Sequence, residues 1–158
     1  MRTSVAVFAM ALLAGTQMGC ASGSRAPAPP RVAVQNIEAL PATAQQQRYR
    51  VTLLIDNPNT EPLEIKEIKF TLRLASEGLL DGRSNELLTV QALDQRTVTY
   101  ELRSEIVSSP QRLMSFVQGP ANALPYELYG EVTLDRAFLT VLRFAAAGQA
   151  PLAMSNDG

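Results

Sequence analysis

Apolar and polar residues alternate with a period of two over much of this chain, which limits the alternating segments to β-strands with one buried face. The segments with this pattern are 49–56, 68–74, 97–103 and 126–134. Two more strands are predicted over 32–40 and 138–146, the second with apolar residues on both faces. Several short strands in one chain predict an all-β fold, an antiparallel β-sandwich of immunoglobulin-like or fibronectin-III-like build.

The alternation slips by one residue near the middle of the chain. Ile65 and Ile68 are both apolar, and Lys66 and Glu67 fall where a single outward residue is expected. An extra residue on one strand of a pair is what a β-bulge supplies, so a bulge is predicted at Lys66 and Glu67.

Turn residues and one helix interrupt the predicted strands. A proline is excluded from a central ladder, so Pro58 ends the strand before it. Further turns are predicted at Glu77-Gly78 and Asp81-Gly82. A short helix is predicted over 109–119, capped by Ser109 and closed by Gly119-Pro120, where it would cover one end of the sandwich.

The N-terminus has the layout of an export signal. Arg2 supplies a positive start, an uncharged apolar run follows, and Gly19 precedes Cys20, the single cysteine of the chain. The Gly19-Cys20 junction resembles the bacterial lipobox, although Gln17 stands where that motif usually has Leu. The resemblance implies cleavage before Cys20 and lipidation of its side chain; the alternative is an ordinary signal peptide cut after Ala21.

These features divide the chain into four parts. Residues 1–19 are the expected lipoprotein signal peptide, and 20–30 the lipidated cysteine with a flexible tether rich in Pro, Ala and Ser. Residues 31–152 form one predicted domain, and 153–158 a flexible tail. Lipidation predicts a location in the bacterial cell envelope: the outer membrane, facing the periplasm, if the cell is Gram-negative. Without lipidation the protein is expected to be secreted or periplasmic.

The composition argues against several functional classes. The formal net charge is −1 and no run of like charge occurs, so no nucleic-acid partner is expected. There is no histidine, which removes Ser-His, Cys-His and His-metal sites. The polar cluster Asp81, Ser84, Asn85 and Glu86 does not follow the order of a calcium loop. We therefore predict no enzyme, no metal and no cofactor.

One block of the sequence resembles a known family. Residues 51–59, which end in Asn57-Pro58-Asn59, resemble the strand and Asn-Pro-Asn motif of the WHy (water stress and hypersensitive response) domain of late-embryogenesis-abundant type 2 proteins. The likeness continues through Gly130 to Leu152 and covers nearly all of the predicted domain. The motif is interpreted as structural, because Asn tolerates turn dihedrals and Pro fixes φ. Gly130, inside a strand, is read as a bend or close packing.

The resemblance implies a stress-protective protein that acts on clients or membranes without catalysis. We expect exposed strand edges to contact aggregation-prone chains, because such edges offer unpaired backbone groups. Two alternatives remain open: an envelope adaptor that docks one specific protein partner, and a module that binds a lipid between its sheets.

Overall fold

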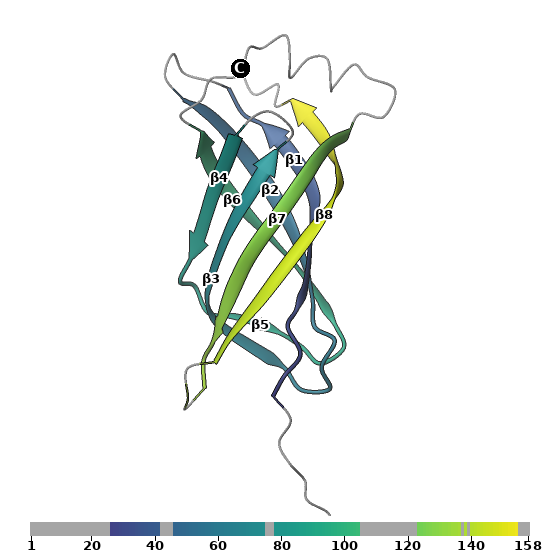
Figure 1. Cartoon of the computed structure of the whole chain (residues 1–158), viewed down its shortest axis with the longest axis vertical. Helices are drawn as coiled ribbons and strands as arrows, with labels where there is room; N and C mark the ends of the chain where they lie inside the picture. Colours follow the sequence, from purple (N-terminus) through teal and green to yellow (C-terminus); the bar gives the residue numbers. More distant parts are fainter. Residues whose placement is uncertain are drawn as a thin grey trace, which may run out of the picture.

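Strands form the regular structure of the residues that the structure describes (Figure 1). The structure, a computed structural model, describes residues 26–41, 46–74, 78–104, 123–136, 138 and 140–154. The strands in chain order are β1 (Arg31–Ala39), β2 (Gln47–Asp56), β3 (Leu63–Leu74), β4 (Gly78–Ser84), β5 (Leu88–Val90), β6 (Gln95–Ser104), β7 (Ala123–Leu134) and β8 (Thr140–Met154). The prediction of an all-β sandwich is confirmed.

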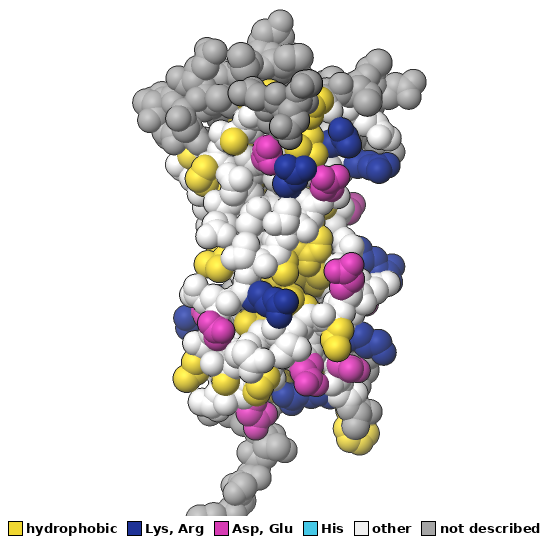
Figure 2. Space-filling view, turned by 180° about the vertical axis from the view of Figure 1, so that it is seen from behind, with side chains coloured by type: hydrophobic (Ala, Val, Ile, Leu, Met, Phe, Trp, Pro, Cys, Tyr) yellow, Lys and Arg dark blue, Asp and Glu magenta, His cyan; other side chains and the backbone are white. Residues whose placement is uncertain are grey.

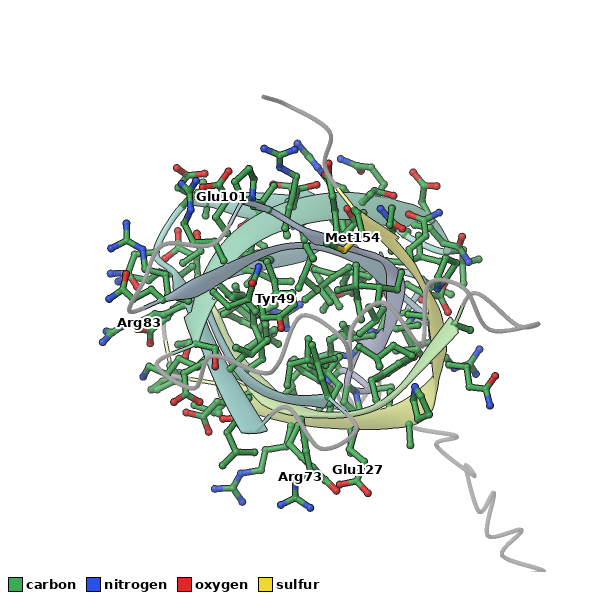
Figure 3. The ribbon with its side chains drawn as sticks, turned by 90° about the horizontal axis from the view of Figure 1, so that it is seen from above. Tyr49, Arg73, Arg83, Glu101, Glu127 and Met154 are labelled. Atoms are coloured by element: carbon green, nitrogen blue, oxygen red, sulfur yellow. The ribbon has the colours of Figure 1, made fainter. Side chains whose placement is uncertain are left out.

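The strands follow the order β4-β3-β7-β8-β1-β2-β6, with β5 beside β3. All neighbouring pairs are antiparallel except β1 and β8, which pair in parallel from Ile37 opposite Leu152 to Ala39 opposite Met154. The long strand β8 therefore belongs to both sheets: it pairs with β7 over most of its length and with β1 at its end. The terminal strands β4 and β6 contact each other, so the sheet is nearly closed (Figures 1 and 3).

The core lies between the two sheets and is built by the alternation that the sequence shows. Every second residue of β2 from Gln47 to Ile55 is buried, and β3 and β7 bury the matching positions on the opposite sheet. Figure 3 shows Tyr49 pointing into the interior, whereas Arg73 and Glu127 stand outside. Burial of this continuous apolar cluster is the main favourable term in folding.

The predicted bulge in β3 is confirmed. Ile65 lies opposite Leu134 and Glu67 opposite Thr133, so Lys66 is the extra residue. The extra residue allows both Ile65 and Ile68 to point into the core, although three positions separate them and strict alternation would place them on opposite faces.

The predicted turn at Asp81-Gly82 is wrong. Both residues lie inside β4, with Gly82 opposite Phe70 of β3. A Cβ at position 82 would lie 2.1 Å from the Phe70 ring, so this glycine makes room for an aromatic side chain and does not mark a reversal. The short strand β5, which pairs with the start of β3, was not predicted either.

Two boundaries differ from those expected, and some predictions fall outside the described residues. β8 extends to Met154, two residues into the range expected as a tail. Pro30, the last residue of the expected tether, is buried against the domain. The predicted helix over 109–119 and the signal segment with Cys20 lie outside the described residues.

Candidate functional site

The Asn57-Pro58-Asn59 turn is a hydrogen-bonded junction at one end of the sandwich. Asn57 is fully buried, and its side-chain Oδ1 accepts a hydrogen bond from the backbone N–H of Asn59 at 2.9 Å. Its Nδ2 lies within 2.9–3.1 Å of three carbonyl oxygens, those of Glu61, Val90 and Gln91. One amide thereby ties the β2–β3 connection to the end of β5. These contacts all lie within the chain, to its own backbone and to the Asn59 side chain.

Asn59 attaches the segment that leads into the domain. Its Nδ2 donates to the carbonyl of Ala28 at 2.9 Å, and its Oδ1 accepts from the backbone N–H of Ala28 at 2.8 Å. This two-way pairing mimics one step of a strand ladder. The end of the expected tether is therefore held at the same turn that Asn57 organises.

Gly130 sits where two neighbours leave no space for a side chain. A Cβ there would lie 2.3 Å from the Phe144 ring and 2.6 Å from the backbone oxygen of Lys69. Phe70 on β3 lies opposite Gly82 of β4 on one side and opposite Gly130 of β7 on the other. Gly130 in turn lies opposite Phe144 of β8. Glycines and phenylalanines thus alternate across four strands, so that each ring packs over a glycine.

The facing edges of β4–β5 and β6, here called the seam, are where the strand order ends. β4 and β5 pair with β3, and β6 pairs with β2; the described residues of β4 and β6 form no ladder with each other. Two side-chain contacts lie near the seam. The ring of Tyr100 on β6 packs edge to face against the ring of Phe70 on β3, with centroids 5.1 Å apart. The side chain of Arg96 on β6 donates to the carbonyl of Thr89 on β5 at 3.0 Å.

A strand edge without a ladder carries backbone donors and acceptors that can pair with an extended segment of another chain. The outward residues at the start of β6 are exposed, among them Thr97 and Thr99. The seam was foreseen from the sequence only as a general property of strand edges. Its place at β4 and β6 depends on which strands end the sheet, which alternation does not reveal.

Tyr100 gives the seam a neutral polar group. Burial of its side chain raises the pKa of Tyr100 to about 12, and the negative charge of Glu86 adds to this effect. The phenol therefore stays protonated at every physiological pH and can donate a hydrogen bond.

The outer faces carry paired charges of both signs, interspersed over the face that Figure 2 shows. On one sheet, Arg50 bridges Glu38 at 2.9 Å and Glu101 at 3.3 Å across three strands. Hydrogen bonds to Glu101 and Glu38 raise the pKa of Arg50 further above its usual value. On the other sheet, the Lys69 ammonium holds the pKa of Glu67 below its usual range, with a smaller contribution from Arg83.

An open groove of about 450 Å³ crosses the outer face of the second sheet, above the two glycines. One wall is the row Arg83, Lys69, Glu131 and Arg143, which lie opposite one another on four neighbouring strands. The other wall contains Asp81, Thr71 and the half-exposed Tyr129. Its mixed charge suits a protein surface better than a single anion or cation. The sequence pattern did not single it out.

Members of the polar cluster that was compared with a calcium loop take part in local hydrogen bonds. Asp81 accepts a hydrogen bond from the Thr71 hydroxyl at 2.7 Å, and the Ser84 hydroxyl accepts one from the N–H of Glu86 at 3.2 Å. Within the described part of the chain, no group of three or more His, Cys, Asp or Glu side chains could hold a metal ion.

These features define a class of protein: a small β-sandwich domain whose two sheets are joined by the parallel pairing of its first and last strands. A family model described as late embryogenesis abundant protein (LEA_2) matches residues 52–145, more than half of the chain. The chain belongs to this late embryogenesis abundant family. The family fits a stress-related role without catalysis.

Solved structures agree on the fold. The chain is similar to a protein from Arabidopsis thaliana solved in solution, at 19% identity and a TM-score of 0.55, over 87% of this chain and 91% of that one. It is also similar to a structural-genomics target solved by X-ray crystallography, at 8% identity and a TM-score of 0.50, over 81% of this chain and 90% of that one. No curated protein matches the sequence. None of the described residues belongs to a helix long and apolar enough to cross a membrane.

Proposed function

We propose that this chain is a WHy-type lipoprotein of the bacterial envelope that protects other proteins during water stress without catalysing a reaction. The observation that carries the proposal is the family match, which extends from β2 into β8 and so includes most of the domain. The hydrogen-bonded Asn57 turn and the open seam support it, because the first fits a rigid scaffold and the second fits contact with unfolded chains.

The anchoring part of the proposal rests on the sequence around Cys20. Cleavage after Gly19 would leave Cys20 as the first residue, with lipid on its side chain and at its amino group. Two or more acyl chains give lasting attachment, whereas one chain binds only marginally. In a Gram-negative cell, Ala21 after the cysteine favours the outer membrane over inner-membrane retention. Cleavage after Ala21 would instead release the protein into the periplasm or the medium.

Protection would act through the seam. Clients that lose structure on drying expose extended apolar segments, and a strand edge can pair with such a segment through backbone hydrogen bonds. The neutral, half-buried Tyr100 and its neighbour Phe70 add apolar contact without demanding a particular client sequence. Binding of this kind is sequence-tolerant, as protection of many clients requires.

The first test is a drying experiment. The mature chain from Cys20 onward, with Cys20 replaced by Ser to keep it in solution, is dried with a labile enzyme and compared with an equal mass of an inert globular protein. Activity after rehydration should be clearly higher with this protein at or below an equimolar ratio. Rescue no greater than that of the inert protein overturns the protective function.

Paired charge variants test whether clients bind at the seam. The double variant Thr97→Lys and Thr99→Lys places two positive charges along the open edge of β6, where they oppose strand docking. The control Ala145→Lys and Ala147→Lys adds the same charge at exposed positions of the central strand β8. Rescue should fall with the first pair and persist with the second. Equal rescue by both pairs would place client binding outside the seam.

The groove above Gly82 and Gly130 favours a second candidate, an adaptor for one specific envelope partner. Its mixed-charge walls and half-exposed Tyr129 suit a defined protein surface. This function predicts a discrete complex after mild crosslinking in cells, lost in Tyr129→Ala. A uniformly monomeric protein would argue against it.

A further inference from the structure

The two most exposed large hydrophobic side chains in the described part of the chain are those of Phe138 and Leu93. Phe138 is 85% exposed and Leu93 is 70% exposed. Phe138 lies in the β7–β8 connection and Leu93 in the β5–β6 connection.

Both connections lie at one end of the sandwich, here called the entry end. Arg31, the first residue of β1, lies opposite Asp56 of β2, which lies opposite Gln95, the first residue of β6. The β5–β6 connection therefore lies at the same end as the start of β1, with β2 between them. The β7–β8 connection lies at the same end, because the N–H of Asp135 donates to the carbonyl of Glu64 near the start of β3 at 2.8 Å. Figure 2 shows hydrophobic side chains at the lower end of the molecule.

Leu93 has a backbone conformation that its side chain does not favour. Its φ of 56° lies in the left-handed region, where Gly or Asn is the usual residue. A leucine that is both strained and exposed contributes nothing to the core of its own domain. Its apolar side chain is therefore available to contact a surface outside the domain.

The chain enters the domain at the entry end, which fixes how an anchored domain would face its membrane. The pairing of Ala28 with Asn59 holds the lead-in against this end. The stretch from the proposed anchor, Cys20, to the residue before Ala26, the first described one, is only residues 20–25. At about 3 Å per extended residue, these six residues reach about 20 Å, less than the domain would need to turn its other end to the bilayer.

We propose that the entry end rests on the lipid bilayer and that Phe138 and Leu93 insert into its interfacial region. This inference builds on the proposed lipid anchor at Cys20. The anchor raises the effective concentration of the entry end at the membrane, so that two apolar side chains suffice for contact.

The charges at the entry end indicate which bilayer it fits. Arg31 pairs with Asp56 at 3.6 Å and Arg136 pairs with Glu61 at 3.6 Å, so both arginines are neutralised within the domain. Glu64, Asp94 and Asp135 then outnumber Arg96, so this end carries a net negative charge among the described residues. Such a surface is repelled by anionic lipids, so contact should be closest with zwitterionic phosphatidylcholine or phosphatidylethanolamine.

The test uses two natural properties of the chain, the absence of tryptophan and the single cysteine. The mature chain from Cys20 onward is coupled through the Cys20 thiol to a maleimide lipid in vesicles. Phe138→Trp then carries a sole tryptophan at the entry end, and Tyr129→Trp is the matched control on the outer face of β7. Vesicles with brominated acyl chains quench a tryptophan that enters the bilayer. Thermal unfolding of both variants verifies that they are folded.

Quenching of Phe138→Trp should exceed that of Tyr129→Trp several-fold in phosphatidylcholine and should decrease in vesicles rich in phosphatidylglycerol. Adding Leu93→Asn to Phe138→Trp should lower the quenching in phosphatidylcholine vesicles, because one of the two inserting side chains is lost. Equal quenching of the two tryptophans overturns the inference. A third sole tryptophan, Leu93→Trp, repeats the measurement independently if position 138 disturbs its loop.

Chemical coupling keeps this result separate from the proposed function. Whether cells lipidate Cys20 is decided by the mass of the mature chain from membranes. An unlipidated chain would refute the natural anchor, whereas the vesicle measurement would still show whether the entry end contacts lipid.

Discussion

The hydroxyl of Tyr126, on β7, accepts a hydrogen bond from the backbone N–H of Val34, on β1, at 3.2 Å across the interior of the sandwich. Val34 lies at the register shift between β1 and β2, where the ladder is interrupted. Tyr126 thus links the two sheets by a polar contact next to the shift in the β1–β2 register.

Tyr126→Phe should lower the free energy of unfolding by about 1–3 kcal/mol, because it leaves the buried N–H of Val34 without its acceptor. Urea unfolding would measure the change. Tyr129→Phe is the control: its hydroxyl bonds the exposed Glu127 carboxylate, so its loss should change stability by less than about 0.5 kcal/mol. Equal effects of the two variants would contradict a role for the link between the sheets.

Asn57→Ala should destabilise the domain by about 3 kcal/mol or more, because several buried carbonyls lose one shared donor. Chemical denaturation gives the value. Asn85→Ala, at an exposed position, should stay within about 0.5 kcal/mol of the parent protein. A small effect at Asn57 would show that the motif is not the structural junction described above.

Gly130→Ala should cost about 1–3 kcal/mol through overpacking, because its Cβ would meet the Lys69 backbone oxygen at 2.6 Å and a backbone atom cannot turn aside. Gly148→Ala should cost less, since the nearest atom to its Cβ is 3.3 Å away on the Tyr126 side chain. Thermal unfolding of the two variants would test this order, and the reverse order would refute the argument from packing.

Stability should decrease between pH 10 and pH 12 through Tyr100. Its pKa rises from 10.0 to about 12 in the folded protein, so folding favours the protonated phenol. This contribution is complete below pH 10 and is lost as the pH rises toward the folded value. Unfolding measured along this pH range should show a smaller loss for Tyr100→Phe than for the parent protein, and parallel curves would contradict the assignment.

The alternation of side chains predicted much of this fold, because it reflects burial on a sheet and needs no knowledge of which strands pair. Tyr49 to Ile55 of β2 illustrates this, and the phase slip at Lys66 even located a bulge. Gly82 misled the prediction, since a glycine that accommodates the Phe70 ring has the same sequence appearance as one in a turn.

The candidate site was harder to predict because it depends on contacts between distant residues. The buried amide of Asn57 reaches carbonyls more than thirty positions away, which no local pattern indicates. The seam arises from strand order, and the parallel pairing of β1 with β8 that sets this order involves only three residue pairs. The exposure of Leu93 is likewise set by a turn conformation that its sequence does not favour.

The pairing of β8 with both β7 and β1 has a consequence for synthesis. A ribosome releases β1 first and β8 last, so the sheet stays open until residues 152–154 have emerged. Contacts between the two ends of a domain carry a high loop-closure cost and form slowly. The domain therefore completes its fold only once residues 152–154 are available to pair with β1.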